Sequence, residues 1–140
     1  MPLCLSAGAA ASVLAVNAFT LAWTHSIEKT RWEEDWRLEG QQLHVVAARI
    51  VGSGAGMEPP ADAILRDGIW HYRPSLPPLA EVLLSHSPYA GSYQLCVDGV
   101  CQPIAHYLPG LPRVVTLLLR DCANEVAGRT QAATAAAAPR

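Results

Sequence analysis

Residues Phe19–Leu38 read FTLAWTHSIEKTRWEEDWRL, and this stretch decides the fold. It contains two runs in which apolar and polar residues alternate, separated by a short polar segment. Such alternation is typical of strands with one buried face. The apolar residues are odd-numbered in the first run and even-numbered in the second: Phe19, Leu21 and Trp23, then Trp32, Trp36 and Leu38. We therefore predict an antiparallel hairpin at the centre of the molecule.

The register of this hairpin follows from its apolar faces, because directly opposed residues share a face. The shortest comfortable loop is 28–31, which places Leu21 opposite Leu38, Trp23 opposite Trp36, and His25 opposite Glu34. A slip by one residue would turn Trp36 to water. Glu34 is then a carboxylate on an aromatic face.

A carboxylate in such a place loses hydration energy unless another group pairs with it. His25 is one predicted partner of Glu34. If the turn at 39–42 places Leu38 opposite Leu43, Arg49 lies diagonally adjacent and is a second partner. The sequence therefore predicts a triad of His25, Glu34 and Arg49 on one face.

Two interpretations of this triad stay open. It is the wall of a ligand or metal site, with Ser26 and Glu28 at the rim, or it is a buried polar network that fixes the sheet. Histidine and carboxylates can hold a divalent metal, but their spacing here matches no metal motif. Ser26 follows His25 in a strand, so their side chains point to opposite faces and a Ser-His relay is disfavoured. We assign no catalytic residue and expect no cofactor.

The rest of the chain is a series of short apolar runs separated by Gly, Pro and polar segments. This pattern predicts an all-β, mostly antiparallel fold, a small sandwich or open barrel of short strands and hairpins. We expect one β domain over 1–122, followed by a disordered or frayed alanine-rich tail over 123–140. The other expected strands are Leu3–Ser6, Val13–Val16, Leu43–Val51, Ile69–Tyr72, Glu81–Ser87, Tyr93–Val97, Val100–Ile104 and Val114–Leu119.

The charge of the chain argues against nucleic-acid binding. The formal net charge is −2, and the 10 Lys and Arg residues are scattered along the sequence. A protein that neutralises phosphates normally gathers its basic residues on one face. We therefore do not expect nucleic acid as a partner.

Four cysteines suggest two bridges. Asp98-Gly99 is a strong two-residue hairpin turn, which places Cys96 opposite Cys101 at a distance that a disulfide accepts. Cys4 and Cys122 could form a second bridge if the terminal strands are neighbours. The alternative is reduced thiols that pack in the sheet, and zinc is disfavoured because no second ligand pair at metal spacing stands nearby.

The segment Gly52–Pro60, GSGAGMEPP, is the other unusual stretch. It lacks the G-K-[ST] of a phosphate loop, and Pro59-Pro60 prevents the helix that a dinucleotide fingerprint requires. Gly54, Gly56 and Glu58 therefore belong either to a ligand-binding loop or to a tight loop that only packs on the hairpin.

Two features of the sequence give opposed indications about the cellular compartment of the protein. Disulfides indicate an oxidising, extracytoplasmic compartment. Residues 2–27 carry no Asp, Glu, Lys or Arg, but their polar interruptions and strand-like alternation do not form a clear signal peptide. A membrane anchor or export signal in this segment remains an alternative.

FTLAWTHSIEKTRWEEDWRL followed by ARIVGSGAGMEPP resembles the bacterial domain of unknown function 1850 family over residues 3–122. The family's polar signature falls here on His25, Ser26, Glu28 and Glu34, and its glycine loop on 54–56. Family members are often encoded beside, or fused to, tripartite transporters that use an extracytoplasmic solute receptor.

This resemblance implies a periplasmic accessory or ligand-binding module whose partner is a transporter component or its solute. It implies no established activity. Two alternatives are kept: a purely structural or interaction domain, and, ranked last, a metal-dependent enzyme that uses His25 and Glu34.

Overall fold

A computed structural model of the chain describes residues 2–24, 30–51, 59–89 and 93–123. Most of these residues lie in antiparallel strands, so the predicted all-β class is confirmed. The strands are β1 (Leu3–Ala7), β2 (Ala10–Leu14), β3 (Ala18–Thr24), β4 (Arg31–Glu39), β5 (Gln42–Val51), β6 (Ile64–Arg66), β7 (Ile69–Tyr72), β8 (Val82–His86), β9 (Tyr93–Val97), β10 (Val100–Pro103) and β11 (Val115–Asp121).

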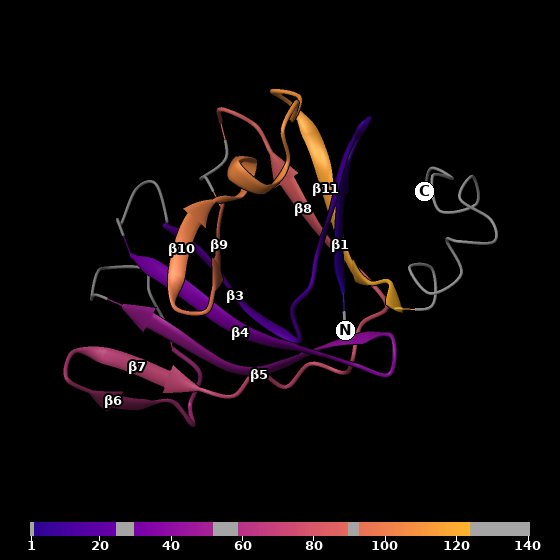
Figure 1. The fold of residues 1–140 in the computed structure, drawn as a ribbon. Coiled ribbons are helices and arrows are strands. Elements are labelled where there is room, and N and C mark those ends of the chain that lie inside the picture. Colours follow the sequence, from indigo (N-terminus) through magenta and orange to yellow (C-terminus); the bar gives the residue numbers. More distant parts are fainter. Residues whose placement is uncertain (1, 25–29, 52–58, 90–92, 124–140) are drawn as a thin grey trace.

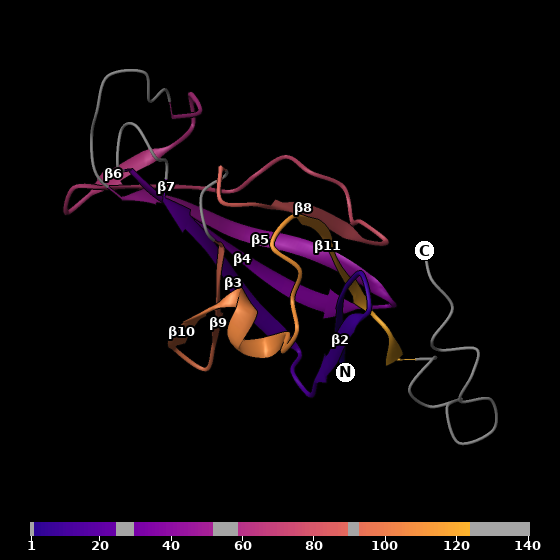
Figure 2. The same cartoon turned by 90° about the horizontal axis from the view of Figure 1, so that it is seen from above.

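The strands form two antiparallel sheets, as Figure 1 shows. The smaller sheet has the order β2-β1-β11-β8, and the larger has the order β10-β9-β3-β4-β5-β7-β6. Neither sheet closes into a barrel, so the described residues form the open, sandwich-like alternative. Figures 1 and 2 both place β6 and β7 at the end of the larger sheet that lies away from β1 and β11.

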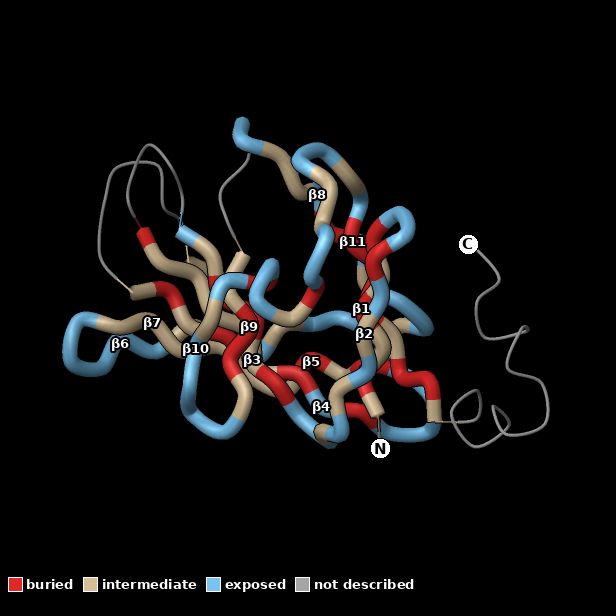
Figure 3. The backbone as a smooth tube through the Cα atoms, turned by 45° about the horizontal axis from the view of Figure 1, so that its top comes forward, coloured by how far each residue is buried: buried red, intermediate tan, exposed pale blue. Residues whose placement is uncertain are grey.

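The core lies where the two sheets face each other, and Figure 3 shows buried backbone along the strands of both sheets. Each fully buried leucine contributes roughly 1.5–3 kcal/mol. The smaller sheet contributes Leu3, Leu5, Leu84, Leu117 and Leu119, and the larger contributes Phe19, Leu21, Trp36, Leu38, Leu43, Val45 and Leu95. We call the face of the larger sheet that carries these residues its inner face, and the opposite side its outer face.

The central hairpin forms, but its predicted register is wrong by four residues. Leu21 lies opposite Glu34 rather than Leu38. Phe19 pairs with Trp36 and Trp23 with Trp32, and both ring pairs stack, with centroids 6.4 and 6.3 Å apart. Cross-strand aromatic pairs of this kind stabilise a sheet. The shift is an even number, so every side chain stays on the predicted face.

A β-bulge changes the predicted pairing between β4 and β5. Leu38 lies opposite Leu43 as expected, but the register shifts between Asp35 and Trp36. Trp36 then pairs with Val45, while Asp35 pairs with Ala47, so one extra residue enters β5. Because a bulge exchanges the two faces of a strand, Arg49 reaches the outer face rather than the face of Glu34. The predicted contact between Glu34 and Arg49 is therefore wrong.

Both disulfides are present. Val97 lies opposite Val100 and Cys96 opposite Cys101, and the Cα atoms of the bridged pair are 3.9 Å apart. Asp98 and Gly99 both have positive φ, 53° and 80°, as the tight turn requires. Since β1 pairs with β11, the terminal strands are neighbours, and Cys4 and Cys122 are bridged with Cα atoms 5.8 Å apart.

The strand expected at Val13–Val16 is displaced, because β2 begins at Ala10 and ends at Leu14. The other differences are small. β7 and β9 have the predicted bounds, whereas β6 was not predicted because its three residues are all exposed and show no alternation. The expected strand to Ile104 ends at Pro103, where a short 3-10 helix, Ile104–Tyr107, begins. The predicted tail lies outside the described residues from 124 onward. In the part of the chain that the structure describes, no helix is long and apolar enough to span a membrane.

Candidate functional site

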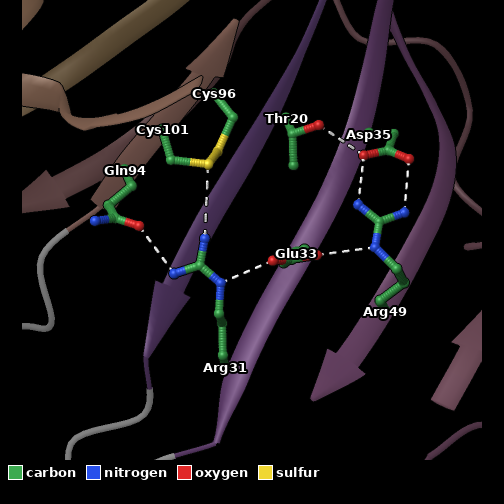
Figure 4. Close-up of a disulfide and its surroundings, with 8 residues drawn as sticks. All are labelled: Thr20, Arg31, Glu33, Asp35, Arg49, Gln94, Cys96 and Cys101. Carbon is green, nitrogen blue, oxygen red and sulfur yellow. Dashed lines mark hydrogen bonds and ion pairs between the residues drawn. A yellow bond between two sulfur atoms is a disulfide. The ribbon is translucent and has the colours of Figure 1, made fainter. Parts of the chain in front are cut away.

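The outer face carries a chain of alternating charges, shown in Figure 4. The Arg49 Nη1 and Nη2 atoms each donate to one carboxylate oxygen of Asp35 at 2.7 Å, and Arg49 Nε donates to Glu33 at 2.9 Å. The Arg31 Nε atom donates to the other oxygen of Glu33 at 2.7 Å, and its Nη1 atom donates to Gln94 at 2.8 Å. Each charge is thus paired with an opposite one.

The pKa values on this face follow from the pairing. Burial alone would raise the pKa of Glu33, but hydrogen bonds from Arg31 and Arg49 hold it below its usual value. The hydrogen bonds from Arg49 lower the pKa of Asp35 despite its partial burial, and Thr20 Oγ1, which donates at 2.7 Å, lowers it further. These carboxylates are satisfied, which is the signature of a structural network.

The inner face is different, because one charged residue lies among apolar and aromatic ones. The strand pairings place Glu34 in a row across the sheet with Leu95, Leu21, Ala48 and Tyr72. The next row, nearer the end of the sheet, contains Tyr93, Trp23, Trp32, Ile50 and Trp70. Among the described strand residues of the larger sheet, Glu34 is the one charged side chain on this face.

The aromatic residues around Glu34 are not sealed in the core. Trp23, Trp32, Trp70, Tyr72 and Tyr93 each keep part of their surface exposed. Trp23 lies against Trp32 and against Tyr93, with ring centroids 6.3 and 5.8 Å apart. These three residues form a partly exposed aromatic cluster, while Trp70 and Tyr72 lie on the same face beyond the β5 residues Ile50 and Ala48. We call the five aromatic residues together with Glu34 the inner-face site.

Among the residues that the structure describes, nothing gives Glu34 the charge pairing seen on the outer face. Its carboxylate accepts a hydrogen bond from the buried Trp36 indole, Nε1 to Oε1 at 3.3 Å. No ion-pair partner for it occurs among residues 2–24, 30–51, 59–89 and 93–123. Burial raises the pKa of Glu34 above its usual value, and the Trp36 hydrogen bond opposes this rise.

The two tyrosines of the site respond to the same charge. Burial is the main cause that raises the pKa of Tyr72 and of Tyr93, and the negative charge of Glu34 adds to both. The carboxylate therefore acts electrostatically on both sides of its own strand. Among the described strand residues of the larger sheet, no cation on this face balances an ionised Glu34.

The sequence-predicted site residues divide into three groups. Glu34 lies on the inner face and Arg49 on the outer face, so the sheet separates them. The other six, His25, Ser26, Glu28, Gly54, Gly56 and Glu58, lie outside the described residues. The strand residues nearest those segments are paired in a row, Thr24 with Arg31 and Arg31 with Val51, at the same end of the sheet as Trp23 and Trp32.

Sequence reasoning missed Trp70, Tyr72 and Tyr93 as site residues. They come from β7 and β9, which the chain brings beside β5 and β3 through connections that the sequence does not specify. A signal existed in Trp70-His71-Tyr72, where two aromatic residues alternate around a polar one. Nothing in the sequence showed that this face would meet Glu34.

Metal binding gains no support from the described geometry. Within the described ranges, no group of three or more His, Cys, Asp or Glu side chains could hold a metal ion. A catalytic constellation of the Ser-His kind is also not formed by these residues, because Ser26 and His25 lie outside them. The arrangement that the described residues do form is suited to binding.

Comparison with protein families matches residues 19–104 to the family described as Domain of unknown function (DUF1850). The chain belongs to the DUF1850 family. The matched part of this DUF1850 chain contains β8 and all the strands of the larger sheet, and so includes Glu34 and its aromatic neighbours. No curated protein and no solved structure matches the DUF1850 chain.

Proposed function

We propose that this chain is a non-enzymatic, periplasmic ligand-binding module that serves a tripartite solute transporter. One observation carries the proposal: a partly buried carboxylate, Glu34, stands on a partly exposed aromatic face with no described cation to balance it. Burying a charge costs free energy unless another group pairs with it, and the described residues supply no cation for Glu34. A binding function explains why the charge is there.

The outer face provides an internal comparison for this argument. Glu33 and Asp35 are the sequence neighbours of Glu34, and arginines hold both of them. Where this sheet uses carboxylates for stability, it therefore supplies their partners from β4 itself and from the neighbouring β5. Glu34 departs from that rule on the same strand.

The compartment and the partner rest on separate support. All four cysteines are in disulfides, which favours an oxidising environment and is consistent with the periplasm. The link to transport comes from the resemblance to family members encoded beside, or fused to, tripartite transporters. The partner on this proposal is a transporter component or its solute.

The competing proposal is a purely structural or interaction domain. The satisfied network of Arg49, Glu33 and Asp35 favours it, since that network explains the stability of the sheet without any ligand. On that view Glu34→Leu is tolerated and has no effect on transport. A metal-dependent enzyme ranks below both.

Solute uptake in a deletion strain tests the proposed function. The gene is deleted in a strain in which it lies beside the genes of a tripartite transporter. The deletion strain is then complemented with the wild-type chain, Glu34→Gln, or the control Glu39→Gln. Glutamine keeps the acceptor for Trp36 but removes the charge, so we expect uptake below saturation to fall about tenfold, the equivalent of one charge-assisted contact. Glu39 is exposed at the end of the same strand, and its variant should match the wild type.

Thermal unfolding provides the control for folding. Glu34→Gln should be at least as stable as the wild type at neutral pH, because it removes a charge whose burial is unfavourable. Unchanged uptake in the deletion strain itself would reject the transport link, and full uptake with Glu34→Gln would reject Glu34 as the site.

A further inference from the structure

We infer that the inner-face site takes a small organic ammonium cation, one whose nitrogen carries apolar substituents. The inference rests on the proposed function and names the ligand class for that site. It follows from three properties of the site: the sign of its charge, the chemistry of its walls, and the separation of the described arginines of β4 and β5 from it.

The charge selects for a positive group. Glu34 is the single charged side chain among the described strand residues of the inner face, and its hydrogen bond from Trp36 leaves the second carboxylate oxygen unbonded by the described residues. An anionic ligand would be repelled by this group. A neutral ligand would leave the buried charge without a partner.

The walls select for an organic cation over a metal ion. The row beside Glu34 contains three aromatic residues, in which Trp23 contacts both Trp32 and Tyr93. Tyr72 lies in the same row as Glu34, beyond Ala48. Aromatic faces attract a cation within about 6 Å of the ring centroid, and groups of such faces recognise quaternary ammonium ligands. Ca²⁺ and Mg²⁺ instead require several oxygen ligands, and the described residues place no second carboxylate on this face.

Among the described residues, the arginines of β4 and β5 do not compete for the site. Arg31 and Arg49 lie on the outer face, where Glu33 and Asp35 bind them, and Arg37 pairs there with Glu39. The inner-face site therefore combines a carboxylate with aromatic surface and no described cationic side chain.

Titration with choline, and with its uncharged isostere 3,3-dimethyl-1-butanol, tests the inference. The sample is the full disulfide-bonded chain, and binding is measured by tryptophan fluorescence and by calorimetry. We expect saturable choline binding, at least tenfold weaker binding of the neutral isostere, and about a tenfold loss of choline affinity in Glu34→Gln. Glu39→Gln should bind choline like the wild type.

Three results would overturn the inference. These are the absence of saturable choline binding, equal affinities for choline and the isostere, and choline affinity that Glu34→Gln leaves unchanged. If choline fails while uptake still depends on Glu34, the proposed function stands and the ligand class is wrong. If choline binds as expected while uptake is independent of the protein, the ligand class stands and the transport link is wrong.

Discussion

Replacing Cys4 and Cys122 together by serine should lower the free energy of unfolding by about 5 kcal/mol. The bridge joins residues 118 positions apart, so it restricts almost the whole unfolded chain. It also fixes β1 to the end of β11, the pairing through which the two ends of the chain meet in the smaller sheet. For a domain of this length, we expect a fall in Tm of about 15 °C.

The Cys96–Cys101 bridge is the matched control, because it closes a loop over a separation of 5 residues. The same substitution there should cost only about 2 kcal/mol by the chain-entropy relation. Denaturant unfolding of the two double variants compares them directly. Equal losses, or a larger loss at Cys96 and Cys101, would contradict this explanation of how the fold is held.

Arg49→Met should lower the free energy of unfolding by about 2 kcal/mol at neutral pH. The variant removes three hydrogen bonds to two carboxylates, whose side chains are 22% and 32% exposed. Partial exposure keeps the loss below that of a fully buried pair, and Arg31 and Thr20 still bond to Glu33 and Asp35. Arg37→Met is the control, since its ion pair with Glu39 is exposed and should contribute no more than about 0.5 kcal/mol.

The effect of Arg49→Met should depend on pH with a definite sign. The pKa values of Glu33 and Asp35 are lowered in the folded state from ordinary values of 4.5 and 3.8. Their stabilisation is therefore present above those values and is lost as the pH falls through the folded pKa values. Urea unfolding should show a gap between wild type and variant that narrows below about pH 4. A gap that widens in acid would contradict the proposed role of the network.

Alternation was enough to predict the faces of β3 and β4 in the larger sheet. Phe19, Leu21 and Trp36 lie on the inner face as predicted, because a period of two fixes the face independently of the partner strand. The Cys96–Cys101 hairpin was also predictable, since Asp98-Gly99 specifies both the turn and the pairing. Local rules of this kind depend only on neighbouring residues.

The register and the bulge depend on more than neighbouring residues. The predicted register was chosen because it gives the shortest loop, whereas the observed register stacks two aromatic pairs. The sequence does not show which of these two contributions to stability is larger. The bulge did leave a trace in β5, where the buried residues change from odd at Leu43 and Val45 to even at Ala48 and Ile50. Reading that change of parity would have moved Arg49 to the outer face. The meeting of β7 and β9 residues with Glu34 had no such trace.

Native, non-reducing intact mass of the full chain, produced in an oxidising compartment, tests the central claim most directly. The claim is that this is an exported binding module with Glu34 at its site. We predict a mass lower than that of the reduced chain by the hydrogens of two disulfides, and a non-covalent adduct that survives desalting in the wild type and in Glu39→Gln but is absent from Glu34→Gln. Free thiols together with an unliganded wild-type chain, or an adduct that Glu34→Gln retains, would contradict it.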